Sequence, residues 1–159
     1  MVAKIEHKQR TACPLACALD IVGDHWTLLI VRNLMFLGIH EYKDMLKTAE
    51  SISSSILTNR LKKLELDGLI ASIAHPDSQR RKLYYLTTMG KDLIYLMTEL
   101  ILWAHKNMAA SVNIPEHKKV MLEKDPEQFI RLTLQELDTW EKQFVPNNTA
   151  GSGAMCASQ

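Results

Sequence analysis

The fold is decided by SSSILTNRLKKLELDGLIASIAHPDSQRRKLYYLT, residues 53–87. Leucines recur in its first part at three- and four-residue intervals, which is the spacing of one buried face of a helix. These leucines are Leu57, Leu61 and Leu64. Ser53 precedes them and can cap the helix, while Gly68 follows where a left-handed residue often ends one. We therefore expect a helix over residues 53–67.

The period of the sequence changes after Gly68. Short β-type runs, LIASIA over 69–74 and KLYYLT over 82–87, flank the turn-rich and charged segment HPDSQRR. A two-stranded hairpin with a basic tip is the expected result.

Helical patterns surround this stretch on both sides. They predict helices over 13–21, 24–37 and 41–48 before it, and over 88–110, 116–123 and 126–144 after it. Pro14 suits the first position of a helix, and Asp24 and Thr87 suit N-caps. The expected core stripes are Trp26, Ile30, Leu34 and Leu37, then Met89, Leu93, Leu96, Met97, Leu100, Ala104 and Met108, and finally Ile130, Leu134, Leu137, Trp140 and Phe144.

Short helices followed at once by a hairpin with a basic tip predict a mainly α (α+β) fold, a winged helix-turn-helix with a two-stranded wing. We expect an N-terminal arm over 1–12, a DNA-binding domain over 13–112 and a disordered tail over 145–159. The helix over 88–110 would serve dimerisation. An apolar stripe left in water is unfavourable, so the extension over 113–144 should pack on a partner subunit or on the 88–110 helix; we interpret it as dimerisation structure.

In this fold the helix over 53–67 enters the major groove of DNA. Its outward positions, together with the wing arginines, form the expected DNA-binding set: Ser53, Ser54, Ser55, Thr58, Asn59, Lys62, Arg80 and Arg81. Hydroxyls and amides can contact base edges and phosphate oxygens, and the basic groups suit phosphate. The alternative is a serine cap followed by an ordinary solvated face. Arg60 lies near the buried leucines and is expected to pair with a nearby acid.

Length and composition limit the other possibilities. The chain has 159 residues, 47% of them hydrophobic and 23% charged, which suits one soluble domain. No apolar run approaches the length of a membrane span, and the charged N-terminus lacks a signal-peptide pattern, so we expect a cytoplasmic protein without membrane association. The segment up to Lys91 carries 13 basic and 9 acidic residues, against 6 and 9 after it. This split is compatible with a polyanion-binding N-terminal part.

Three separated motifs carry a family resemblance: CPLACALDIVGDHWTLLIVRNL, ISSSILTNRLKKLELDGLI and YYLTTMGKDL. In order and spacing they resemble the HxlR-type winged helix-turn-helix regulators of the MarR-like group, over about residues 13–106. The resemblance implies a bacterial homodimer that binds double-stranded DNA at a pseudo-palindromic operator. The wing lacks the double proline common in that family, which leaves open which arginine enters the groove.

Cys13 stands at the expected cap of a helix, where the helix dipole favours a thiolate. The resemblance implies a redox or electrophile sensor at this position, so an oxidant or small molecule is a possible effector. Alternatively, Cys13 is a small buried apolar residue. A zinc site from Cys13, Cys17, His7 and His25 fits no common spacing, so no metal or cofactor is expected. The remaining histidines, including His40 and His75, are interpreted as surface or boundary residues.

Two function classes remain beside the thiol question. The first is a sequence-specific DNA-binding transcriptional regulator that acts as a homodimer. The second is a winged-helix protein-interaction adaptor without DNA binding. An enzyme is not expected, because the sequence shows no phosphate loop, paired carboxylates or base beside Cys13. Aromatic and methionine residues of the 88–110 helix could line an effector pocket, but dimer packing is the simpler interpretation.

Overall fold

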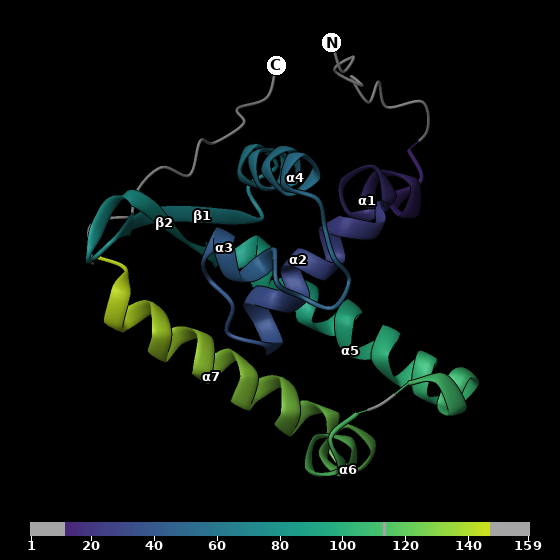
Figure 1. Cartoon of the computed structure of the whole chain (residues 1–159). Helices are drawn as coiled ribbons and strands as arrows, with labels where there is room; N and C mark the ends of the chain where they lie inside the picture. Colours follow the sequence, from purple (N-terminus) through teal and green to yellow (C-terminus); the bar gives the residue numbers. More distant parts are fainter. Residues whose placement is uncertain (1–11, 113, 147–159) are drawn as a thin grey trace, which may run out of the picture.

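The computed structural model describes residues 12–112 and 114–146. Over this part of the chain the elements are α1 (Pro14–Val22), α2 (His25–Phe36), α3 (Tyr42–Met45), α4 (Ser54–Leu66), β1 (Ile70–His75), β2 (Ser78–Leu86), α5 (Thr88–Met108), the 3-10 turn η1 (Ala109–Ser111), α6 (Glu116–Lys124) and α7 (Pro126–Phe144). Helix α2 runs through the middle, with α4 and the hairpin on one side and α5 and α7 on the other (Figure 1). This is the expected winged helix-turn-helix, extended by two further helices.

Side-chain caps set the starts of the main helices, as the sequence predicts. The Asp24 carboxylate accepts from the backbone N–H groups of Trp26 and Thr27 at the start of α2. Ser53 Oγ accepts from Ile56 N–H at 3.3 Å in α4, and Thr87 Oγ1 accepts from Gly90 N–H at 3.2 Å in α5. Each cap satisfies a helix N–H that has no partner within its own helix.

The hairpin is longer than the sequence pattern indicates. Strand β2 begins at Ser78 rather than Lys82, so Pro76 and Asp77 alone form the turn. The strands are antiparallel, with a register irregularity between Ala74 and His75. Consequently Arg80 and Arg81 lie within a strand and not at the tip. The run SQRRK has no apolar alternation to reveal a strand: Ser78 pairs with His75 and Lys82 with Ala74, while residues 79–81 between them form the irregularity and have no partner in β1.

One hydrophobic core joins α2, α4, the hairpin and α5. Its most deeply buried members include Ile30, Leu34, Leu57, Leu64, Leu69, Ile70, Leu86 and Ile94. The residues expected to be buried on α2 and α4 therefore belong to the core or pack against it, except Leu37, for which the prediction is wrong. Leu37 is 52% exposed, because α2 ends at Phe36 and Leu37 serves as its C-cap.

The apolar stripe expected on α5 is only partly buried. Met97 lies in the core, but Met89, Leu96, Leu100 and Met108 are 41–47% exposed. Ile94 and Thr98, which the stripe omitted, are fully covered instead. Helix α5 thus carries more apolar surface than the other described residues cover.

The C-terminal extension packs on its own chain. Helix α7 contacts α5, α6 and α2, and its Leu137 enters the core. Lys91 of α5 donates to Asp138 at 2.6 Å and to Glu141 at 2.9 Å on α7. Burial by itself lowers the pKa of Lys91, but the bonds and charges of these two carboxylates outweigh it, so the pKa is raised. Two packing partners are expected for this stripe, a partner subunit or the 88–110 helix. Within the single chain, α7 packs against that helix.

The two ends of the chain lie largely outside the residues that the structure describes. Except for Ala12, Val145 and Pro146, the arm over 1–12 and the tail over 145–159, including Cys156, lie outside the described residues. Among the helices that are described, none alone is long and apolar enough to cross a bilayer. Helices α1 and α2 reach that length and composition only together, with a 74° bend between them.

Candidate nucleic-acid interface

Helix α4 presents a polar face at its N-terminal end. Ser54, Ser55, Asn59 and Lys62 are exposed, because the three leucines of this helix turn into the core. Ser53 caps α4, which is the role that the alternative of an ordinary solvated face gave it. Its Oγ also lies 3.2 Å from Ser55 Oγ. The face beyond the cap is open and carries hydroxyl, amide and ammonium groups.

Thr58 differs from its neighbours because α3 reaches it. It is half-buried, and its Oγ1 lies 3.1 Å from the Tyr42 hydroxyl. Tyr42 donates its only hydroxyl proton to the Ser54 carbonyl at 2.9 Å, so Thr58 must be the donor to Tyr42. The sequence pattern placed Tyr42 on α3 without showing this role. Tyr42 sets the position of α3 against the first turns of α4.

The two wing arginines have different surroundings. Arg81 Nη1 lies 3.4 Å from Glu41 Oε2, and Arg81 Nη2 lies 2.9 Å from His75 Nδ1. Arg80 is exposed and has no ion pair within the described chain. Arg81 is therefore tied to the body of the domain, whereas Arg80 projects from β2.

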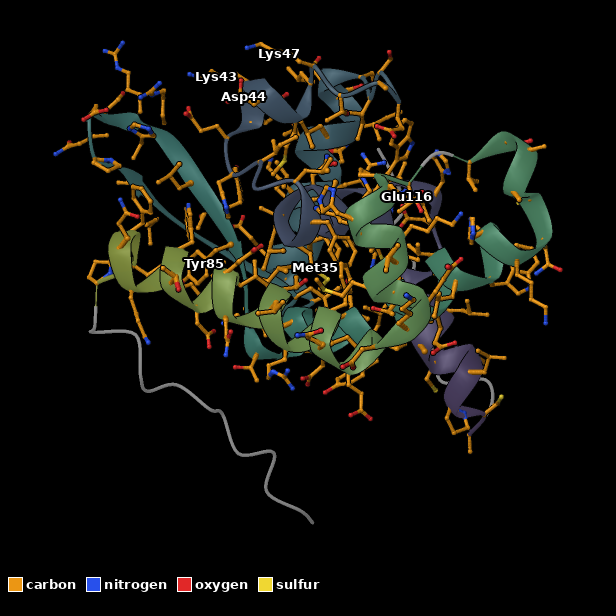
Figure 2. All side chains as sticks on the ribbon, turned by 90° about the horizontal axis from the view of Figure 1, so that it is seen from below. Met35, Lys43, Asp44, Lys47, Tyr85 and Glu116 are labelled. Atoms are coloured by element: carbon orange, nitrogen blue, oxygen red, sulfur yellow. The ribbon has the colours of Figure 1, made fainter. Side chains whose placement is uncertain are left out.

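Two more basic residues lie near the wing. Lys82 is exposed on β2, and Lys43 of α3 lies with its Nζ 3.5 Å from Glu41 Oε2. Together with the wing arginines they line a notch of about 330 Å³ between α3 and β2, whose other walls are Glu41, Tyr42 and Tyr84. Figure 2 shows Lys43 of α3 and Lys47, in the turn just after α3, at the edge of the molecule. Sequence reasoning missed Lys43, since only the folded chain brings α3 beside β2.

Other basic residues are used within the protein. Arg60 Nη1 pairs with Asp24 at 3.2 Å, which confirms the expected acid partner. Lys63 pairs with Asp67 one turn along α4. Lys62, by contrast, is exposed and has no ion pair in the described part of the chain. The groups available for a polyanion are thus Lys62 on α4 and Arg80 and Lys82 on the wing, with Lys43 beside them.

Cys13 is exposed at the N-cap of α1, so the alternative of a buried apolar cysteine is wrong. Cys17 is half-buried one turn further on. Across residues 12–112 and 114–146 no group of three or more histidine, cysteine or acidic side chains could hold a metal ion. His7, one member of the zinc alternative, lies outside the described residues.

His40 is buried, so the prediction of a surface or boundary residue is wrong. It is only 9% exposed, and its ring stacks on Trp140 of α7 with centroids 3.7 Å apart and planes 9° apart. Its Nδ1 lies 2.8 Å from the Tyr84 carbonyl oxygen, which can only accept. Burial lowers the pKa of His40, with the bond to Tyr84 acting in the opposite direction. Isolated in the sequence, His40 carried no signal of this packing.

A short helix locked to a second helix with an open polar face, beside a two-stranded hairpin, defines a winged helix-turn-helix protein. The model of the HxlR-like helix-turn-helix family matches residues 21–112, more than half of the chain. The chain belongs to this family, and it is a transcriptional regulator of helix-turn-helix fold. Helices α6 and α7 lie beyond the matched range.

Bacterial relatives and solved structures agree with this assignment. The chain is 33% identical over 97 residues to the HTH-type transcriptional regulator YvaP of Bacillus subtilis, covering 60% of this chain and 89% of the relative. It is 29% identical to the regulator YodB of the same organism, covering 69% and 97%.

Among solved structures, PA1607, described as a candidate transcription factor, superposes with a TM-score of 0.59 at 28% identity and covers 67% of this chain and 73% of that one. The oxidised form of the redox regulator HypR gives a TM-score of 0.53 at 26% identity, covering 60% and 97%. The names of these relatives are those of regulators or of a transcription factor.

Proposed function

We propose that this protein is a sequence-specific DNA-binding repressor or activator that acts in the cytoplasm as a homodimer on a pseudo-palindromic operator. The observation that carries the proposal is the pairing of two surfaces. The N-terminal half of α4 exposes Ser54, Ser55, Asn59 and Lys62, and the neighbouring wing exposes Arg80 and Lys82. Hydroxyl and amide groups on a helix suit base edges, and unpaired cations beside it suit phosphates.

The two wing arginines have different roles in this proposal. Arg80 has no internal partner in the described chain and can approach a phosphate or a narrow minor groove. Arg81, held by Glu41 and His75, fixes the wing against α3 and contributes charge to the notch. Thr58 is hydrogen-bonded to Tyr42, so its role in this proposal includes positioning the N-terminal turns of α4 and is not limited to contacting bases.

The homodimer is supported by a second surface. On α5, Leu96, Leu100 and Trp103 are 41–60% exposed, and on α1, Leu15 and Leu19 are 54–67% exposed. Apolar side chains gathered at helical spacing on two helices are typical of a protein interface. A two-fold dimer places two α4 helices about one DNA turn, roughly 34 Å, apart.

DNA binding is tested by selecting fragmented genomic DNA with the reduced protein at about physiological salt. We expect recovery of a shared inverted repeat. On that site, Lys62→Ala and Arg80→Ala should each weaken binding and reduce the salt slope by about 1, because each removes a phosphate contact. Asn59→Ala should relax sequence preference if the amide reads a base. Recovery of nothing above background, in both the reduced and the oxidised protein, favours the adaptor without DNA binding.

We also propose that Cys13 makes the regulator responsive to oxidants. Cys13 is exposed at a helix N-terminus, and HypR, a structural relative, is named a redox regulator. In the proposed step, one Cys13 thiol from each subunit loses a proton and an electron, the sulfurs join, and peroxide is reduced to water. Cys13→Ser should abolish the peroxide response of DNA binding, while Cys17→Ser should retain it. An unchanged response in Cys13→Ser refutes the proposal.

A further inference from the structure

A cleft of about 390 Å³ lies where the α2–α3 loop, the hairpin and the end of α7 meet. Its walls include Ile39, Leu83, Trp140 and Phe144, and its polar lining comes from His40, Glu41, Asp44 and His75. Helix α7 lies beyond the residues matched by the family model, so the extension builds one wall of the cleft. None of the contacts proposed for DNA lies inside it.

Aromatic rings form the inner wall. Trp140 stacks on His40 on one side and lies 5.0 Å from Phe144, between ring centroids, along α7. The stack also keeps His40 buried. Such a wall favours a flat apolar group, and the indole face additionally attracts a cation.

The polar groups in the cleft accept hydrogen bonds. The Tyr84 carbonyl can only accept, so His40 Nδ1 carries the proton and the neutral ring leaves Nε2 as an acceptor. Within the described chain Nε2 has no hydrogen-bond partner and is not itself a buried atom, so it keeps access to solvent although most of the His40 ring is covered. The carboxylates of Glu41 and Asp44 add further acceptor oxygens, of which Asp44 Oδ2 alone has no basic partner in the described chain.

The basic partners of these carboxylates are not among the residues that line the cleft, apart from His75. No lysine or arginine of the described chain is among the residues that line it. Arg81 and Lys43 approach Glu41 through Oε2, whereas Oε1 faces His75 at 3.6 Å. Lys47 pairs with Asp44 Oδ1 at 3.0 Å on the surface of α3. Both carboxylates are thus already paired with a basic group, and what the cleft lining offers is hydrogen-bond acceptors without a lysine or arginine of its own.

We propose that this cleft binds a small aromatic amine in its protonated form. The aromatic body lies against Trp140 and Phe144, and the ammonium donates hydrogen bonds to the Asp44 and Glu41 carboxylates and to His40 Nε2. Hydrogen-bond acceptors beside an indole face are complementary to a cation that carries several N–H donors. Glu41 is shared with Arg81, so an amine here places a positive charge beside the group that holds the wing arginine. This link to DNA rests on the proposed function, whereas binding of the amine does not.

The test uses three probes of equal size and different head groups. Calorimetric titration of the full chain, without DNA, compares 2-phenylethylamine, 2-phenylethanol and phenylacetate. We expect saturable one-site binding of the amine, about tenfold or more tighter than the alcohol, and no binding of the acid. Because no DNA is present, failure of the proposed function does not affect the result. Equal affinity for the amine and the alcohol, or no amine binding, overturns the proposal.

Two variants and a matched control locate the site. Asp44→Asn removes one carboxylate charge from a surface position and should weaken amine binding about two- to fivefold. Trp140→Leu should remove it, with circular dichroism confirming that α7 still folds. Glu136→Gln, an exposed acid on α7 away from the cleft lining, should bind like the parent protein. If Asp44→Asn binds the amine as tightly as Glu136→Gln, the site is refuted.

Discussion

Gly90, in the first turn of α5, is constrained by the neighbouring backbone. A Cβ added there would overlap the Leu69 carbonyl oxygen and lie 3.1 Å from Leu86 Cδ2. That carbonyl also accepts from the N–H of Thr87, so it cannot easily move away. The close approach of α5 to the end of α4 and the start of β1 therefore requires the absence of a side chain.

We expect Gly90→Ala to lower the free energy of unfolding by about 3 kcal/mol, because overpacking against backbone cannot be relieved by a rotamer change. Urea unfolding measures the loss. Gly38→Ala is the control: Gly38 has φ of +63° but nothing near its added Cβ, so it should lose only about 1 kcal/mol through backbone strain. Similar losses in the two variants would show that the Leu69 contact is unimportant.

The ion pair between Arg32 and Glu50 ties α2 to the loop before α4. Arg32 donates to both Glu50 oxygens, at 2.6 and 2.9 Å, and these bonds hold the pKa of Glu50 at about 2, below its ordinary value of 4.5. A carboxylate with a lowered folded-state pKa stabilises the fold above the unfolded value. That stability is lost as pH falls from about 4.5 towards 2.

The pair should therefore show in the pH dependence of stability. At pH 7 we expect Glu50→Gln to unfold with about 1 kcal/mol less free energy than the parent, a value limited by partial solvent exposure. The difference should shrink steadily between about pH 4.5 and pH 2. Guanidinium would screen the pair, so urea unfolding at several pH values is the suitable measurement. A constant difference across this range would contradict the assignment.

At the scale of elements, Asp24 joins α2 to α4. Its carboxylate caps α2 through two backbone N–H groups, accepts from the Thr27 hydroxyl and pairs with Arg60 of α4 at 3.2 Å. One short side chain thus ends the α1–α2 turn and orients the candidate recognition helix. The sequence predicted the cap and an acid partner for Arg60, but not that one residue performs both roles.

Asp24→Ala should cost about 2 kcal/mol of unfolding free energy, because the cap, the Thr27 bond and the ion pair are lost together. Asp24→Asn keeps a capping oxygen and loses the charge, so its cost should be about 1 kcal/mol or less. Thermal unfolding of both variants and of Arg60→Met separates the contributions. If Asp24→Asn is as unstable as Asp24→Ala, the charge and not the cap dominates.

At the scale of the whole molecule, α5 carries a long apolar face that the other described residues leave open. Leu100 and Leu96 are 42% and 41% exposed, while the stripe of α7 is covered by α5 and α2. Burying several such side chains against a second copy would contribute about 1.5 kcal/mol or more each. This favours α5 as the centre of the proposed dimer.

Leu100→Glu should convert the dimer to a monomer without loss of secondary structure, because the residue supports no contact in the core. Analytical ultracentrifugation measures the mass. Leu132 of α7 is 38% exposed, and Leu132→Glu tests the dimerisation role expected for the extension over 113–144. Dissociation by Leu132→Glu alone would move the interface from α5 to the extension.

Local signals in the sequence were enough for most of the architecture. Asp24, Ser53 and Thr87 marked helix starts, Gly68 marked the end of α4, and the change of period after it marked the hairpin. These features act within a few residues of each other, so the linear sequence shows them. The polar face of α4 could be predicted in the same way, since its opposite face is defined by three leucines.

What the sequence by itself determined is therefore the order of elements, the winged helix-turn-helix class and the candidate α4 face. Only the tertiary structure decided that Arg81 is held by Glu41 and His75 while Arg80 is not, that His40 stacks on Trp140, and that Gly90 admits no side chain. Each of these depends on groups far apart in the chain, whose approach is set by how the elements pack. Periodicity and capping describe one element at a time and carry no record of that packing.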